Sequence, residues 1–395
     1  MKAGWETVRL ADVCTFRPPK SEARKRLAET DIVSFAPMED LGVDQKYFKP
    51  SGVRPLGSVA GSYTYFADGD VLLAKITPCF ENGKLGIARD LENGIGFGSS
   101  EYFVIRPSSR VTAEYLYYFL SQPSFREAGA QSMTGAVGHK RVAKDFLEEH
   151  VLPLPPPPEQ QRIVAILDEA FAGIATARAA AEQNRQNARA LFESHLQSIF
   201  SQRGEGWVDK TLGDVCELFQ GLCINAKTKH LLVESSNLPL LRIKDLRDNS
   251  SEQYVAEAGW PKNAFVTESE IIYTRTGQIG LVFRGRRGVL HNNCFKVTPS
   301  NELNDDYLFW WLQSPAFRAR ITTLASKAAQ PDISHALFKI QPICLPPRSY
   351  QDQAIPLINQ IREETQNLEA LYQRKLDALD ELKQSLLHQA FSGKL

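Results

Sequence analysis

The chain has 395 residues, of which 43% are hydrophobic and 23% charged, and its 46 basic and 46 acidic residues balance to a net charge of zero. This composition predicts a folded protein of two or three domains and excludes a disordered one. The sequence shows no leader-like segment and no apolar run long enough to span a bilayer, so we expect a cytoplasmic protein that contacts no membrane.

A neutral chain can still bind nucleic acid, because DNA needs only a local basic face where its phosphates are touched. The 6 cysteines form no CxxC pair and have no clustered histidines beside them. We therefore expect buried, reduced thiols and no metal site.

The sequence contains an internal repeat. A first set of residues near the start recurs near the middle in the same order: Trp5, Leu10, Asp12, Val13 and Cys14 against Trp207, Leu212, Asp214, Val215 and Cys216. The segments 115–126 and 307–318 match in the same way, as do 154–160 and 345–351. We therefore divide the chain into a globular region of residues 1–152, a helical spacer of residues 153–203, a second globular region of residues 204–344 and a second helical spacer of residues 345–395.

The first globular region is expected to be an α+β domain. Strand-like runs occur at 71–73 and 102–105, and an aromatic segment at 115–120 predicts a helix capped by Thr112 that packs on the sheet. Basic and polar residues after the strands can reach a DNA groove, where glycines allow close approach. The candidate DNA contacts in this region are Lys75, Lys84, His139, Lys140, Arg141 and Lys144.

The first spacer is expected to be one long helix, since 159–201 contains no proline and only one glycine. Apolar or small residues recur there at steps of three and four, which is typical of a coiled-coil seam. We expect this seam to consist of Ile163, Ile166, Ala170, Ile174, Ala177, Ala181, Ala188 and Leu191.

The second globular region repeats the α+β pattern, with strands at 271–273 and 295–297 and an aromatic helix capped by Asn304. Arg275 stands where the first copy has Lys75, and arginine and glutamine can bond base edges with two hydrogen bonds. The candidate DNA contacts here are Arg275, Thr276, Gln278, Arg284, Arg286, Arg287, Lys327 and Gln330.

The second spacer is also expected to be helical. Its seam is leucine-rich where the first is alanine-rich: Leu357, Ile361, Leu368, Leu371, Leu379, Leu382 and Leu386. Proline costs about 3 kcal/mol inside a helix, so we expect a kink or restart at Pro356, with Ser349 and Asp352 capping the first turn. We infer that the two helices pair antiparallel as a spacer between two similar domains related by a pseudo-two-fold axis. A helix of about forty residues is roughly 60 Å long.

The residues of the spacers resemble a known family. The segment 154–163, which reads LPPPPEQQRI, is similar to the junction before the first conserved helix of Type I restriction-modification specificity subunits. The ending 386–395, which reads LLHQAFSGKL, is similar to the end of the second. The domain–helix–domain–helix order resembles the family over the whole chain. The second junction departs from the pattern, because Tyr350 stands where the first copy has Glu159.

This resemblance implies that each globular region is a target recognition domain that reads one half of a split, asymmetric site in double-stranded DNA. The helices would set the gap and dock two methyltransferase subunits, which methylate adenine with S-adenosylmethionine. Restriction subunits, where present, would translocate and cut DNA with ATP and Mg²⁺. No cofactor is expected in this chain.

The sequence agrees with a non-catalytic subunit, because it has neither the Asn/Asp-Pro-Pro-Tyr/Phe motif of an adenine methyltransferase nor a GxxxxGK[ST] phosphate loop. Two alternatives stay open. The chain would be a DNA-modifying enzyme by itself if it methylated DNA alone. It would be a coiled-coil scaffold or inhibitor of a DNA-modifying complex if it read no sequence.

Overall fold

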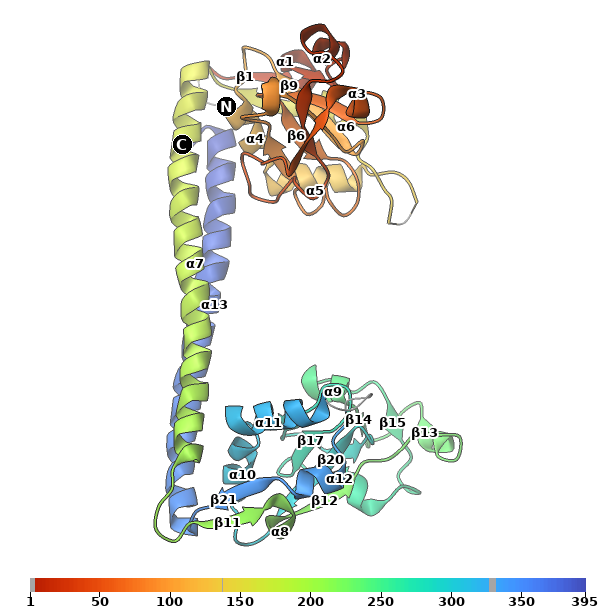
Figure 1. Cartoon of the computed structure of the whole chain (residues 1–395), viewed down its shortest axis with the longest axis vertical. Helices are drawn as coiled ribbons and strands as arrows, with labels where there is room; N and C mark the ends of the chain where they lie inside the picture. Colours follow the sequence, from red (N-terminus) through yellow and green to blue (C-terminus); the bar gives the residue numbers. More distant parts are fainter. Residues whose placement is uncertain (1–3, 137, 327–331) are drawn as a thin grey trace. The chain divides into compact units, whose positions relative to one another are not determined.

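The computed structural model describes residues 4–136, 138–326 and 332–395. They form two compact units, of which unit 1 comprises residues 1–181 and 374–395 and unit 2 comprises residues 182–373. Each unit contains a globular region and one end of each of two long helices (Figure 1). The units therefore cut across the two spacers, because the ends of the helices are packed into the globular cores.

Unit 1 contains two four-stranded sheets and a two-stranded ribbon. The inner sheet has the order β2-β9-β6-β7 and is antiparallel throughout; its strands are β2 (Cys14–Phe16), β9 (Tyr102–Pro107), β6 (Val71–Ala74) and β7 (Leu85–Ile87). The outer sheet has the order β4-β3-β8-β5, with β3 and β8 parallel; its strands are β4 (Gly52–Pro55), β3 (Ile32–Ala36), β8 (Ile95–Gly98) and β5 (Thr64–Ala67). The ribbon pairs β1 (Glu6–Arg9) with β10 (Val151–Leu154).

The helices of unit 1 are short apart from the ends of the long pair. They are α1 (Leu10–Val13), α2 (Ser21–Arg26), α3 (Leu56–Val59), α4 (Ala113–Leu120), α5 (Pro123–Gln131) and α6 (Lys144–Glu149), with a 3₁₀ turn η1 (Glu92–Gly94). In α4 the side chain of Thr112 accepts a hydrogen bond from the backbone N–H of Tyr115 at 3.2 Å, as the sequence predicts. All residues at 115–120 are buried, which confirms that this aromatic helix packs on the sheet.

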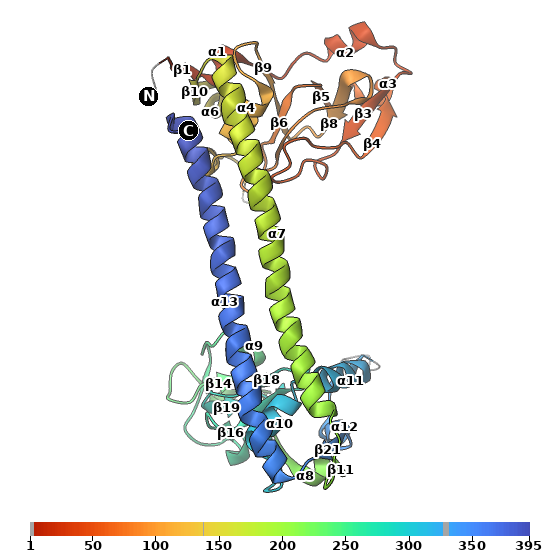
Figure 2. The same ribbon diagram turned by 90° about the vertical axis from the view of Figure 1, so that its left-hand side faces the viewer.

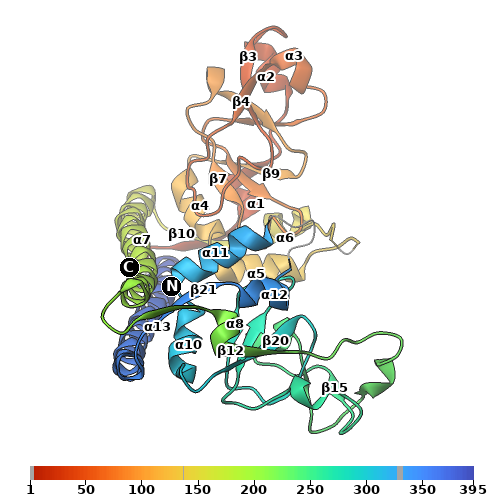
Figure 3. The same cartoon turned by 60° about the horizontal axis from the view of Figure 1, so that its bottom comes forward.

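Unit 2 repeats the inner sheet of unit 1. Its order is β12-β20-β17-β18, formed by β12 (Cys216–Gln220), β20 (Cys294–Pro299), β17 (Ile271–Thr274) and β18 (Val282–Phe283). Figure 3 shows β12 next to β20. Cys14 faces Pro107 in unit 1, and Cys216 faces Pro299 in unit 2. The ribbon recurs as β11 (Val208–Thr211) with β21 (Pro342–Leu345). The internal repeat seen in the sequence is thus a repeat of strand order and register.

The outer portion of unit 2 differs from that of unit 1. It has a three-stranded sheet β14-β19-β16 and a small ribbon β13-β15, formed by β14 (Leu240–Leu241), β19 (Gly288–Leu290), β16 (Phe265–Val266), β13 (Leu232–Val233) and β15 (Tyr254–Val255). The helices are α8 (Leu212–Val215), α9 (Ile243–Arg247), α10 (Asp305–Trp311), α11 (Pro315–Ala325) and α12 (His335–Lys339), with 3₁₀ turns η2 (Lys229–Leu231) and η3 (Lys262–Ala264). Asn304 caps α10 through the N–H groups of Asp306 and Tyr307, as predicted.

The two long helices are α7 (Pro157–Ser201) and α13 (Arg348–Ser392). Within unit 1, Arg178 forms an ion pair with Asp380, and the guanidinium of Arg162 donates to the carbonyl of Leu395 at 2.8 Å. Within unit 2, Arg189 pairs with Glu369 at 3.1 Å. Arg185 of unit 2 also contacts Gln373. In each unit the residue numbers therefore rise along one helix as they fall along the other, so the paired ends are antiparallel (Figure 2).

The buried face of each helix only partly matches the predicted seam. On α7, Ile163, Ile174, Ala181 and Ala188 are buried, and Ile166, Ala170 and Ala177 are half-buried. The prediction that Leu191 lies in the seam is wrong: it is 53% exposed, because the neighbouring Phe192 fills the core position instead. The buried residues Leu167, Ile174, Ala181 and Ala188 follow one another at heptad spacing.

The predicted seam of α13 needs a larger correction. Ile361, Leu379 and Leu386 are half-buried, whereas Leu357, Leu368, Leu371 and Leu382 are between 39% and 50% exposed. The residues that are buried instead are Ile358, Thr365, Leu376 and Leu387. At about 100° per residue these two sets lie on faces roughly 110° apart. The helix therefore carries two apolar faces, and the sequence pattern alone does not distinguish them.

Pro356 does not restart α13, which is continuous from Arg348 to Ser392 with the proline inside it. The predicted cap is also wrong, because the helix begins before Ser349. Asp352 accepts hydrogen bonds from Nε of Arg348 at 3.1 Å and from Nδ2 of Asn304 at 2.8 Å. The hydrogen bond to Asn304 links the start of α13 to the cap of α10.

One glutamine in each copy anchors a long helix to the globular core. Gln160 is fully buried; its Nε2 donates to the carbonyls of Arg110 at 2.8 Å and Pro155 at 2.9 Å, and its Oε1 accepts from the N–H of Thr112 at 2.9 Å. Gln351 makes the equivalent bonds to Glu302, Pro346 and Asn304. Each glutamine joins the start of its long helix to the cap of the aromatic helix.

Replacing Gln160 with leucine is expected to lower the free energy of unfolding by about 2–4 kcal/mol. The change removes the partner of three backbone groups, of which the Pro155 carbonyl is buried and the Arg110 carbonyl and the Thr112 N–H are partly buried. A buried group left without a partner costs about 1–3 kcal/mol before relaxation. Denaturant-induced unfolding of the full chain measures the effect. Gln161→Leu is the matched control, since Gln161 is exposed one position away. An equal effect of the two substitutions would contradict the anchoring role.

Among the described residues, no helix combines the length and the apolar character that a bilayer crossing requires.

Candidate nucleic-acid interface

The residue that follows strand β6 in unit 1 and the residue that follows strand β17 in unit 2 make equivalent backbone hydrogen bonds. In unit 1 the N–H of Lys75 donates to the carbonyl of Glu101 at 3.0 Å, and its carbonyl accepts from Val142 at 2.9 Å. In unit 2 the N–H of Arg275 donates to the carbonyl of Asn293 at 2.8 Å, and its carbonyl accepts from Ile333 at 3.0 Å. The structure therefore places the two basic residues that the sequence aligns at equivalent backbone positions.

In unit 1 several predicted cations gather around the end of β6. Nζ of Lys75 donates to the carbonyl of Ser100 at 2.8 Å and lies 5.7 Å from the ring centre of Phe103. Arg141 makes two hydrogen bonds to the carboxylate of Glu101, at 2.8 and 2.9 Å, and these hold the pKa of Glu101 below its usual value. Lys144 pairs with Glu148 at 2.5 Å.

The remaining candidates of unit 1 are separate from this group or lie beside it. Lys84 donates to the carbonyl of Met38 at 2.8 Å, where it ties down a loop of the outer core. His139 and Lys140 are exposed, and the carbonyl of His139 accepts from Arg141 at 3.0 Å. We call the residue that follows β6 in unit 1, or β17 in unit 2, the strand exit. The loop at 139–141 is bound next to the strand exit of unit 1 and presents the side chains of His139 and Lys140 outward.

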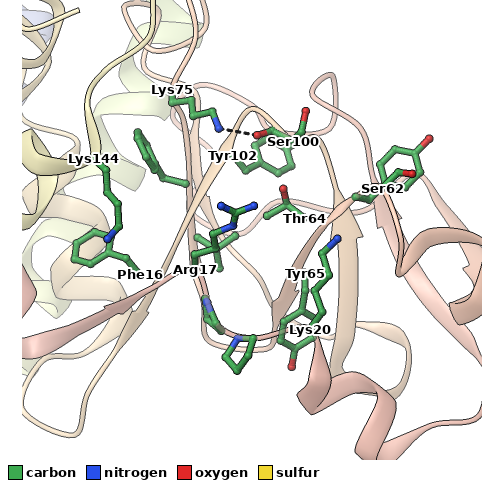
Figure 4. A pocket seen from close by; sticks show the side chains of 15 residues that line it. Phe16, Arg17, Lys20, Ser62, Thr64, Tyr65, Lys75, Ser100, Tyr102 and Lys144 are labelled. Carbon is green, nitrogen blue, oxygen red and sulfur yellow. Dashed lines mark hydrogen bonds between the residues drawn. The ribbon is translucent and has the colours of Figure 1, made fainter.

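A pocket with a volume of about 560 Å³ opens beside Lys75 (Figure 4). Its lining comes from the ends of β2, β6 and β9 in the inner sheet and from β5 in the outer sheet. The cations of the lining are Arg17, Lys20, Lys75 and Lys144. Lys75 and Lys144 were predicted, but Arg17 and Lys20 were missed. The sequence signal that could have indicated them is the segment 16–20, which reads FRPPK and places two basic residues around a proline pair after a strand.

In unit 2 the corresponding arginine is bound within the protein. Nε and Nη2 of Arg275 donate to the carboxylate of Asp332 at 3.0 and 2.6 Å, and Nη1 donates to Oε1 of Gln220 at 3.1 Å. Gln278 is exposed on the following turn, and the hydroxyl of Thr276 is buried without a hydrogen-bond partner among the described residues. Arg275 is thus held rigidly in place, with part of its side chain still exposed.

The predicted cluster of Arg284, Arg286 and Arg287 is divided among three places. Arg284 pairs with Asp306 and donates to the carbonyl of Asp305 at 2.9 Å. Arg286 donates to the carbonyls of Asp245 at 2.9 Å and Ser250 at 2.6 Å, so it holds the loop after α9. Arg287 is exposed, with its guanidinium 5.7 Å from the ring centre of Phe265.

Lys327 and Gln330 lie outside the described residues.

The residues of both copies match one protein family. The family model for the Type I restriction modification DNA specificity domain matches residues 2–183 and 204–374. The chain belongs to this family and carries two copies of its domain.

Three specificity subunits are similar in sequence to part or most of this chain. The EcoEI specificity subunit of a Type I restriction enzyme from Escherichia coli is 40% identical over 162 residues, which cover 41% of this chain and 27% of that subunit. The EcoAI specificity subunit from the same organism is 38% identical over the same shares. The MjaIX specificity subunit of Methanocaldococcus jannaschii is 22% identical over 85% of this chain and 79% of the subunit. The match thus spans about a quarter of the two E. coli relatives.

Solved structures support the fold. A chain from a study of complex assembly and conformational transition of the type I R-M system has a TM-score of 0.84 at 18% identity, with coverage of 100% of this chain and 99% of that chain. The HsdS subunit from Thermoanaerobacter tengcongensis has a TM-score of 0.63 at 19% identity, with coverage of 100% and 98%. These likenesses confirm the α+β architecture with its internal repeat.

Proposed function

We propose that this chain is the sequence-reading subunit of a Type I restriction-modification complex and has no catalytic site of its own. Residues 1–152 and 204–344 act as two target recognition domains, each reading one half of an asymmetric site in double-stranded DNA. The observation that carries this proposal is the repeated strand exit, which presents Lys75 in unit 1 and Arg275 in unit 2 from the same backbone position. The side chains around the two exits differ, so the half-sites should differ.

The spacers 153–203 and 345–395 are proposed to dock two methyltransferase subunits. In unit 2, Leu357, Leu368 and Leu371 of α13 are exposed, and Leu382 has the same helical phase further along. At about 100° per residue these four leucines fall within an arc of roughly 60°. A row of exposed leucines on one side of a helix is typical of a surface that a partner helix covers.

The partners supply the chemistry in this proposal. The methyltransferase subunits bind S-adenosylmethionine, and restriction subunits, where a system has them, use ATP and Mg²⁺. The helices set the gap between the half-sites, so adding residues to both spacers is expected to change the length of the gap and leave the two half-sites unchanged.

Selection from a random duplex library tests the proposal. The complex of this chain with its methyltransferase is incubated with the library, and the bound DNA is sequenced. We expect a two-part motif separated by a gap of fixed length. Binding without any motif would contradict sequence reading and support the scaffold or inhibitor alternative. Methylation by the isolated chain would contradict the non-catalytic role.

Arg275 gives a test confined to the second half-site. Arg275→Ala is expected to weaken binding of the complex to the preferred duplex by about 1–3 kcal/mol. Discrimination between bases should be lost only in the second half-site and stay unchanged in the first. Competition binding measures this effect, and Asp332→Ala is the comparison because it frees the arginine without removing it. An equal loss on every duplex would instead identify Arg275 as a phosphate contact.

A further inference from the structure

The pocket of unit 1 has an unbalanced charge. Its lining includes Arg17, Lys20, Lys75 and Lys144 and has no aspartate or glutamate. From outside the lining, Glu148 pairs with Lys144 and Glu101 attracts Lys75, so Arg17 and Lys20 carry most of the unpaired charge. The ammonium groups of Lys20 and Lys75 donate to the carbonyls of Gly61 at 2.9 Å and Ser100 at 2.8 Å, and carbonyls do not neutralise their charge. Burial lowers the pKa of both lysines. An anion in the pocket would compensate for this cost.

The backbone of Arg17 is fixed while its side chain is available. Its N–H donates to the carbonyl of Val104 at 2.9 Å, its φ is 58°, and Pro18 and Pro19 follow it. A left-handed backbone is costly for arginine, and prolines restrict the chain that leaves it. Figure 4 shows the guanidinium pointing into the space beside Thr64 and Tyr102. Among the described residues, no hydrogen bond or ion pair engages that guanidinium.

Among the described residues of unit 2, Arg275 takes the place of Lys75, but no basic residue takes the place of Arg17. Phe16 faces Ile105 in unit 1 and Leu218 faces Val297 in unit 2, so Arg17 corresponds to Phe219. Phe219 continues the strand β12, and the nearby Lys296 is neutralised by Glu270 at 2.8 Å. The fixed arginine with an unpaired guanidinium is therefore a feature of unit 1 that unit 2 lacks at the same strand position.

We propose that Arg17 reads the edge of a guanine in the first half-site, while Lys20 and Lys75 bind the DNA phosphates beside it; this rests on the proposed function. A guanidinium forms two parallel hydrogen bonds to O6 and N7 of guanine in the major groove. Lysine ammonium groups act as point charges and suit phosphate oxygens. A rigid backbone under Arg17 lowers the entropy lost when the side chain binds.

Competition binding with the methyltransferase complex tests the proposal, using duplexes in which each base pair of the motif is changed in turn. Arg17→Ala is expected to weaken binding of the preferred duplex about 10- to 100-fold and to abolish discrimination at one G·C pair of the first half-site. Discrimination in the second half-site stays unchanged. Arg17→Lys is expected to keep binding to non-specific DNA but to lose the same discrimination, because an ammonium cannot form the paired bonds.

Two further variants separate the roles. Lys20→Ala is expected to weaken binding on all duplexes alike and to reduce the salt dependence by about one unit of slope. Arg24→Ala is the matched control, since Arg24 is exposed on α2 and pairs with Glu29 at 3.6 Å. Unchanged discrimination in Arg17→Ala, an equal loss on all duplexes, or a lost preference at an A·T pair would each overturn the proposal. If the wild-type complex itself shows no motif, the proposed function fails instead.

Discussion

A chain carrying both Leu368→Asp and Leu371→Asp is expected to lose the methyltransferase subunits that we propose as its partners, while remaining folded. Both leucines are exposed in this chain, so aspartate costs little before assembly. In the complex each leucine would be covered, and full burial of a leucine contributes about 1.5–3 kcal/mol. Loss of both contributions, together with burial of two charges, predicts an affinity reduced by more than about 100-fold.

Co-elution in size-exclusion chromatography and titration calorimetry with the purified methyltransferase measure this loss. The matched control is Gln366→Asp with Ala370→Asp, because these residues are exposed on the same helix but face away from the leucines. The control adds the same charge and should bind as the wild type does. Retained binding by the leucine variant would show that the partners dock elsewhere.

Phe391→Ala is expected to destabilise unit 1 by about 3–5 kcal/mol. Phe391 lies near the end of α13, only 9% exposed, with its ring centre 5.0 Å from that of Tyr115 and 5.4 Å from that of Phe119. The last turns of the chain therefore complete the core that surrounds the aromatic helix α4. Removing the ring leaves a cavity against α4.

Hydrogen exchange at backbone amides of the full chain measures where this stability is lost. Protection should fall in α4 and in β10 of unit 1 and should be unchanged in β17 and β20 of unit 2. Leu382→Ala is the control, since Leu382 is 47% exposed on the same helix. Equal protection in the two variants would mean that the end of α13 does not belong to the core of unit 1.

Much of the fold could be predicted because it rests on local patterns. The caps Thr112 and Asn304, the buried strands and the two long helices follow from short stretches of sequence. The internal repeat also indicated which segments of the two halves correspond to each other. The face that α13 buries could not be predicted in this way, because both of its candidate faces are apolar. Only the core contacts of Ile358 and Leu387 decide between them, and those contacts join the helix to residues distant in sequence.

The candidate site was less predictable than the fold. The strand exits at Lys75 and Arg275 were found because the repeat aligns them. Their partners were not found, because the bonds of Arg275 to Asp332 and Gln220 join residues that are distant in sequence. Arg17 was missed because its role depends on a left-handed backbone and on a pocket formed by two sheets. Neither feature is visible in composition or periodicity.

Methylome sequencing tests most directly whether each unit reads its own half-site. Cells express the methyltransferase with this chain, or with a version whose residues 204–344 come from another specificity subunit. We predict adenine methylation at an asymmetric, two-part target, of which only the second half changes after the replacement. Methylation at two identical half-sites, or a change in both halves, would contradict the account.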